Sequence, residues 1–280
     1  MNDALDPALI LAAARGLYYI AVMFLFGDLA FGLIIHARLP VIVLSQDMRL
    51  SRTALAAAAA ASLAWFLVTV AGMAGTLDRP AMVQTITATL FGQLFMVRIG
   101  ALVLLAPILK RGGRVAAGLA LAALGLPAAT SHAAAASPAG LTVFGASLDA
   151  LHLVTAGFWI GGLAVLLQLH RRKEPNILLA LSLFSEWAMI AVLLLVMTGL
   201  INAASILLGD EGKPSLLYLA VLGAKLVLVA LMLGLAAMNR FRLMPQGQDH
   251  VIARNAALEL GAGVIAVLLA GVLGQLQPTL

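Results

Sequence analysis

Eight long apolar runs dominate this sequence and leave few folds open to it. With 63% hydrophobic and 10% charged residues, the chain is far more apolar than a soluble domain, in which about 25% of residues are charged. Most runs reach the roughly 20 residues that a helix needs to cross a bilayer. The sequence therefore predicts an all-α membrane protein with eight transmembrane helices, surrounded by membrane lipid. The expected spans are residues 8–35, 54–75, 83–109, 115–130, 148–169, 178–208, 216–238 and 254–275.

The basic residues predict how these helices are oriented. Lys and Arg concentrate in the loops after the first, third, fifth and seventh spans, for example at Arg49, Lys110, Arg171 and Arg242. Because loops rich in Lys and Arg stay in the cytoplasm, we expect both termini and the loop at residues 131–147 on the opposite side. The net charge of +5 follows from this topology, so nucleic acid is not an expected partner.

The predicted helices form two groups of four within one membrane domain, over residues 1–130 and residues 148–280, with the loop at residues 131–147 between them. When the first span is laid on the fifth, Phe26–Ala30 falls on Ile160–Ala164. Four helices in each half would make the halves parallel repeats, related by an axis along the membrane normal. Chance similarity among helices rich in alanine and leucine explains the match equally well.

Asp149 and His152 stand at the start of the fifth apolar run. A carboxylate and an imidazole three residues apart share one face of a helix. Ionisable groups within or beside a membrane span are costly, and they usually mark an ion path, a ligand site or an internal salt bridge. This segment is therefore the first place where we expect function.

Other ionisable residues lie within the predicted spans at different depths. Arg98 and Lys225 fall in the outer half or the middle of their spans, whereas Asp28, Glu186 and Glu259 fall in the inner third. A structural interpretation is internal ion pairing, for example of Asp28 with Arg98, because either charge alone in hydrocarbon is costly. A functional interpretation is a cation or proton route lined by the three acids. We favour the pair for Asp28 and Arg98, and leave both interpretations open for Glu186 and Glu259.

Polar residues follow one face of the sixth span, at Thr198, Asn202 and Ser205. A polar stripe of this kind must face protein or water rather than lipid. It points toward the outer end of the span, where His152 also lies. Contact with a ligand and hydrogen bonding between helices explain the stripe equally well.

The candidate metal ligands are histidine, methionine and carboxylate side chains, because the chain has no cysteine. His132 lies in an uncharged loop from which it could reach His152. Two imidazoles with Asp149, or with Met73 and Met82 from the adjacent ends of spans two and three, would suit copper.

Several short motifs occur in an order that resembles the copper resistance protein CopD family over residues 130–275. They are Ser131–Ala133, Asp149–His152, Trp159–Gly162, Phe184-Ser185, Thr198-Gly199, Leu222-Gly223, Lys225, Asn239-Arg240, Leu258–Gly261 and Leu273-Gly274.

The resemblance implies a multi-pass protein of the bacterial inner membrane, and the orientation predicted from the basic loops then puts both termini in the periplasm. It implies copper transport in copper resistance or homeostasis rather than catalysis, with copper received from a periplasmic carrier of the CopC type and moved toward the cytoplasm. His132 and His152 stand where that family has its outer-side histidines. Lys225 opposes cation passage while it stays charged, so we expect it to pair with Asp149 or to act as a gate.

Two other classes of function remain open at this point. A redox membrane protein could use the same histidines near haem or a quinone, with His36 and His170 serving a second site. A structural scaffold or assembly factor would need only the ion pairs and the helix packing.

Overall fold

The computed structural model describes residues 6–36, 38, 48–131, 142–208 and 215–277, and regular structure in these residues is entirely helical. Eight helical segments in the described residues are long and apolar enough to cross a membrane, which confirms the number of spans predicted from the sequence. The helices are α1 (Pro7–His36), α2 (Met48–Ala74), α3 (Arg79–Ala88), α4 (Leu90–Ile108), α5 (Gly113–Gly125), α7 (Thr142–Arg171), α8 (Ile177–Leu208), α9 (Leu216–Met238) and α10 (Asp249–Leu273), with short 3-10 or π turns η1 (Leu126–Thr130), η2 (Asn239–Leu243) and η3 (Met244–Gln246).

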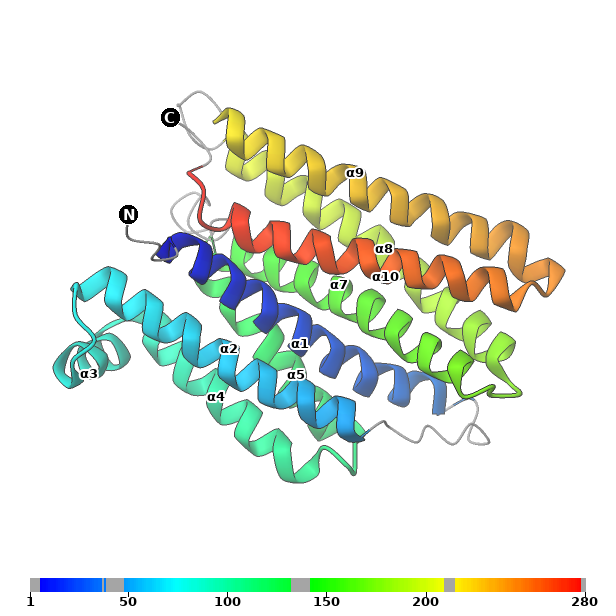
Figure 1. The fold of residues 1–280 in the computed structure, drawn as a ribbon, viewed down its shortest axis with the longest axis horizontal. Coiled ribbons are helices and arrows are strands. Elements are labelled where there is room, and N and C mark those ends of the chain that lie inside the picture. Colours follow the sequence, from blue (N-terminus) through cyan, green and yellow to red (C-terminus); the bar gives the residue numbers. More distant parts are fainter. Residues whose placement is uncertain (1–5, 37, 39–47, 132–141, 209–214, 278–280) are drawn as a thin grey trace.

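The long helices lie side by side, and both chain termini lie at the same end of the bundle (Figure 1). We call this the terminal end; α1, α7 and α9 begin there, and α10 finishes there. The opposite end, which we call the basic end, has the start of α2 with Arg49 and the finish of α7 with Arg171. The positive-inside rule predicts that the basic end faces the cytoplasm.

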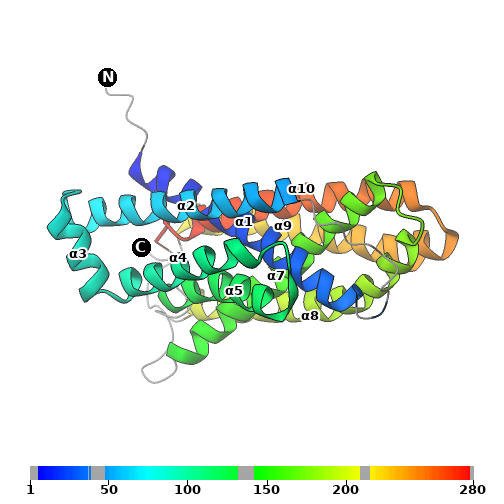
Figure 2. The same ribbon diagram turned by 90° about the horizontal axis from the view of Figure 1, so that it is seen from below.

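The third predicted span is wrong as a single helix, because the chain breaks at Thr89. Its backbone is extended, with φ −119° and ψ 143°, and its hydroxyl accepts a hydrogen bond from the Gly92 amide at 3.0 Å, which caps α4. Residues 79–88 form α3 instead, a short helix that extends beyond the terminal ends of α2 and α4 in the second view (Figure 2). A threonine cap therefore overrides an apolar pattern that continues through the break.

Helices α1 and α7 form the centre of the bundle. α1 packs against α2, α5, α7 and α10, and α7 packs against α8, α10, α5 and α1. Gly27 and Gly161 lie where the two backbones meet: a Cβ added to Gly161 would lie 2.6 Å from the Gly27 Cα. Small residues allow such a close approach of helices in a membrane.

Helices α8 and α9 lie at the periphery of the bundle. α8 packs against α7 and α9 packs against α10, while α8 and α9 make at most weak contact with each other. Both present large apolar side chains outward, such as Leu193, Leu200, Leu217 and Val227. Outward apolar faces of this kind are what a lipid environment favours.

Candidate functional site

His152 projects from the first third of α7 onto α8. Its Nδ1 lies 3.2 Å from the Leu195 carbonyl oxygen and 3.1 Å from the Thr198 hydroxyl oxygen. A carbonyl oxygen can only accept, so Nδ1 carries the ring proton and donates it. Nε2 then keeps its lone pair, and it makes no hydrogen bond to any residue that the structure describes. An imidazole held in this way, through Nδ1–H to a carbonyl, is the usual arrangement of a metal-ligating histidine.

The facing surface of α8 is shaped around the His152 ring. The Thr198 hydroxyl donates to the Leu194 carbonyl at 2.7 Å, which leaves its oxygen available to accept from Nδ1. At Gly199, an added Cβ would lie 3.1 Å from the His152 Cε1. The Thr198-Gly199 pair therefore orients the ring and makes room for it.

A group of polar side chains surrounds His152. We call Asp149, His152, Thr198, Asn202 and Lys225 together the His152 cluster. The Asn202 amide donates to the Asp149 carboxylate at 3.3 Å. The Lys225 side chain, from α9, lies close enough to Asp149 and to His152 to interact with both electrostatically. The cluster thus draws a carboxylate, an imidazole and an ammonium from three helices to the terminal end of the bundle.

The other expected metal ligands do not join this cluster. His132 lies outside the described residues. Met73 is exposed at the end of α2, and Met82 packs against the small core of Phe66, Val70, Ala81 and Phe95. Neither α2 nor α3 packs against α7, so the two methionines are not brought to His152. Within the described residues, no group of three or more His, Cys, Asp and Glu side chains could hold a metal ion.

The expected ion pair of Asp28 with Arg98 is wrong. The buried Arg98 guanidinium lies over the rings of Trp65, at 4.4 Å, and Tyr18, at 4.7 Å, while the Asp28 carboxylate accepts from Ser51 at 3.3 Å. Tyr18 and Asp28 are about 15 Å apart along α1, which separates the two charges. Cation–π contacts, worth about 2 kcal/mol or more when desolvated, therefore replace the carboxylate.

We call the rings of Tyr18 and Trp65 beside Arg98 the Arg98 cage. A second cation, Arg15, also contacts this cage. Its guanidinium lies 5.2 Å from the Trp65 ring and donates to the Gly274 carbonyl at 2.9 Å. The sequence contains a signal for this cage, because Tyr18 and Tyr19 adjoin each other within a span and Trp65 stands in the next. That signal does not by itself pair the aromatic rings with particular arginines.

Glu259 lies in a buried polar network near the basic end. Its side chain is 1% exposed and accepts from the Asn239 amide at 2.8 Å, while Asn255 donates to the Asn239 carbonyl oxygen at 2.8 Å. Asn239 begins the π-helical turn η2, and such turns often occur at functional sites. Glu259 and the Asn239-Arg240 motif were identified from the sequence, whereas Asn255 was not.

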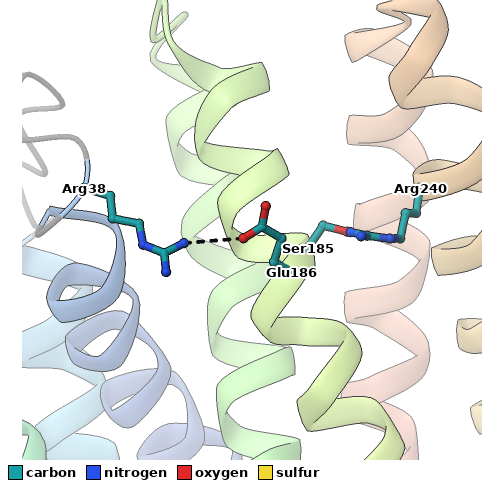
Figure 3. Close-up of polar contacts among 4 residues, drawn as sticks. All are labelled: Arg38, Ser185, Glu186 and Arg240. Carbon is teal, nitrogen blue, oxygen red and sulfur yellow. Dashed lines mark hydrogen bonds and ion pairs between the residues drawn. The ribbon is translucent and has the colours of Figure 1, made fainter.

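Glu186 lies at the surface of α8 instead of in the bundle interior. Its carboxylate pairs with Arg38 at 3.4 Å, with both side chains about half exposed. The adjacent Ser185 faces the opposite way and accepts a hydrogen bond of 2.6 Å from Arg240 (Figure 3). These contacts tie the basic end of α8 to α1 on one side and to η2 on the other.

A large apolar cavity lies apart from these polar sites. It has a volume of about 830 Å³ and is formed by α1, α2, α7 and α10. Its polar lining residues include Thr53, Gln168 and Arg171, near the basic end, and none of the predicted metal ligands lines it.

Comparisons with known proteins place both halves of the chain in one family. Residues 1–142 match the family model for the copper resistance protein D-like N-terminal domain, and residues 178–273 match the model for copper resistance protein D. Copper resistance protein D of Pseudomonas syringae pv. tomato is 33% identical over 152 residues, which cover 47% of this chain and 49% of that protein. Copper transport protein CutJ of Bacillus subtilis (strain 168) is 31% identical over 133 residues, or 46% of this chain and 24% of that protein.

The chain thus spans about half the length, or less, of the curated relatives that it matches. No solved structure matches it. The resemblance seen in the sequence motifs is confirmed, because one family model matches more than half of the chain. With eight apolar helices and family matches in both halves, the chain belongs to the copper resistance protein D family of multi-pass membrane proteins.

Proposed function

We propose that this protein carries copper across the bacterial inner membrane, from the periplasm to the cytoplasm, in copper resistance or homeostasis. The observation that carries the proposal is the His152 imidazole, whose Nδ1–H is held by α8 while Nε2 keeps a free lone pair. The relatives, named for copper resistance and copper transport, supply the identity of the metal.

Copper docks at the terminal end, which the positive-inside rule places in the periplasm. His152 is the central ligand, and Asp149 lies one helical turn away with its carboxylate oriented by Asn202. His132 is proposed as the second imidazole. A periplasmic carrier of the CopC type is proposed to deliver the metal, as the resemblance to the family implies.

Further along the bundle, Glu259 is a better candidate for the route than Glu186. Glu259 is buried and accepts a hydrogen bond from the neutral Asn239 amide, so its carboxyl oxygens are not taken up by a cationic side chain and are available to a passing cation. Glu186 is exposed and already faces Arg38. Lys225 acts as an electrostatic gate on the His152 cluster, since its charge repels a cation at that site.

The two halves of the chain are proposed to be parallel repeats. The neighbours of α1 and of α7 support this, because exchanging the halves turns the α1–α2 contact into α7–α8, and α1–α10 into α7–α5. The pair α2 and α4 is the exception, because these helices pack against each other whereas their counterparts α8 and α9 make at most weak contact. Transport by repeats that rock about a central site is a common transporter mechanism.

Copper binding and cellular copper content test the proposal. Purified wild-type protein should bind one equivalent of copper at the His152 cluster, and the His152→Ala variant should lose that equivalent. In cells that lack the native gene, His152→Ala should also reduce copper uptake at least tenfold. Met197→Leu is the matched control, because Met197 stands next to Thr198 but faces outward. Stoichiometric binding and normal uptake by His152→Ala would contradict the proposal.

A quinone-binding redox protein is the second candidate. The 830 Å³ apolar cavity falls in the size range of small-molecule sites, which is roughly 300–1,000 Å³. A visible spectrum and a quinone assay of the same preparation separate the two functions. A Soret band or stoichiometric quinone without copper would move the function to electron transfer.

A further inference from the structure

His170 and His250 face each other at the basic end of the bundle. His170 stands in the last turn of α7, and His250 is the second residue of α10. Their rings are nearly perpendicular, at 84°, with centres 5.5 Å apart. The two residues lie far apart in the sequence, so only the packing of α7 against α10 brings them together.

The distance between the rings suits one shared metal ion. Imidazole nitrogen binds a transition metal at about 2.0 Å. Two rings on one ion therefore have their centres about 5 Å apart when the angle at the metal is tetrahedral and about 6 Å apart when it is linear. The observed 5.5 Å lies between these limits, so the separation of the two rings is compatible with one shared ion.

The nitrogens of both rings are available to bind a ligand. Neither His170 nor His250 makes a side-chain hydrogen bond to another residue in the described part of the chain. A small cavity lined by His170 and Asp249 adjoins the pair, with a volume of about 20 Å³. That is roughly the room that one bound water or ion needs. The remaining lining residues of this cavity are apolar, for example Leu166, Ile177 and Ile252.

We propose that His170 and His250 form a second copper site, which receives the ion at the basic end and releases it. This inference rests on the proposed copper transport for its metal. Two imidazoles are enough for a monovalent copper ion, whereas structural zinc sites use four ligands. Asp249 supplies one negative charge beside the pair.

The positions of His152 and His170 along α7 fit a transport path with one site at each end. His152 and His170 are about 27 Å apart along the helix at 1.5 Å per residue, close to the roughly 30 Å thickness of the hydrocarbon core. One helix therefore places an imidazole at each face of the membrane. Arg171 and its basic neighbours lower the affinity for a cation at the inner face, as suits a site that must release its ion.

Competition titration with a coloured Cu(I) chelator tests the site on the full-length protein in detergent. Wild type should bind two equivalents of Cu(I), and His250→Ala and His170→Ala should each bind one fewer. Gln248→Ala, two residues before His250 and exposed, is the matched control and should bind like wild type. Zn²⁺ is titrated alongside and should not displace Cu(I) from the site.

The result separates this site from the His152 cluster. His152→Ala should lose a different equivalent, and the double variant His152→Ala/His250→Ala should lose both. If His250→Ala and His170→Ala keep every wild-type equivalent, the inner site does not exist, whatever His152→Ala does. If His152→Ala changes nothing but His250→Ala loses an equivalent, the inner site stands and the proposed outer site fails. Because His250 is exposed, an unchanged melting temperature is expected and excludes misfolding as the cause.

Discussion

Gly27 and Gly161 lie in contact where α1 crosses α7, at positions that coincide when the first span is laid on the fifth. Two helices related by a two-fold axis meet at equivalent residues, as the two sides of any isologous contact do. The contact is therefore what duplicated halves of the chain would produce. It also fixes how closely the two halves can approach.

Replacing Gly161 with alanine should destabilise the protein. The added Cβ would lie 2.6 Å from the Gly27 Cα and the Met23 carbonyl oxygen, and overpacking of this kind costs about 1–3 kcal/mol. Thermal unfolding in detergent measures the effect as a lower melting temperature. Gly118→Ala is the control, because a Cβ there meets nothing within 4 Å. Equal melting temperatures for the two variants would show that the helix crossing can accommodate the added methyl group.

The Arg98 cage predicts energetic coupling between Arg98 and Trp65. With the guanidinium 4.4 Å from the Trp65 ring, Arg98→Met and Trp65→Leu should be non-additive, with a coupling energy of about 1–2 kcal/mol. A double-mutant cycle on unfolding in detergent measures it. Asp28→Asn with Arg98→Met serves as the control cycle and should be additive. Coupling in the control cycle alone would restore the ion pair that the sequence predicted.

Thr198→Val should weaken copper binding at the His152 cluster by roughly tenfold, because partners of a ligating imidazole typically contribute 10–100-fold to metal affinity. The substitution removes the hydroxyl 3.1 Å from Nδ1. Thr155→Val is the control, since the Thr155 hydroxyl donates only to the backbone carbonyls of Leu151 and His152. Copper titration of both variants measures the effect, and equal affinities would mean that Thr198 does not orient the ring.

Lys225→Met should strengthen copper binding at the same cluster. The Lys225 ammonium repels a cation beside His152 and attracts the Asp149 carboxylate, so its removal raises affinity on the order of tenfold. Lys225→Arg keeps the charge and should bind like wild type. Weaker binding by Lys225→Met would indicate that the lysine supports the site instead of gating it.

Glu259→Gln should reduce copper uptake at least tenfold without unfolding the protein. Glutamine can still accept from the Asn239 amide, which donates to Glu259 at 2.8 Å, so the melting temperature should change little. Glu186→Gln is the matched control, because its exposed ion pair with Arg38 is worth at most about 1 kcal/mol. Copper accumulation in cells measures both. Uptake lost in Glu186→Gln and kept in Glu259→Gln would place the route along the surface of α8.

The sequence alone predicted the helices well, because hydrocarbon leaves the backbone no other way to satisfy its hydrogen bonds. It failed at Thr89, where a single side-chain cap ends α3 and starts α4 within a continuous apolar run. Asp149, His152, Thr198 and Asn202 were expected near one another from their depth along neighbouring helices, and the structure brings them together.

The sequence by itself determined the number of spans and which ionisable groups lie within them, since both follow from local hydropathy. Only the tertiary structure decided the partners of those groups. Arg98 lies against Tyr18 and Trp65 instead of Asp28, and His170 meets His250. The physical reason is that the partner of a buried group depends on which helix faces meet. The packing of α1 against α7 through Gly27 and Gly161 decides this, and the periodicity of a single helix does not show which other helix it will pack against.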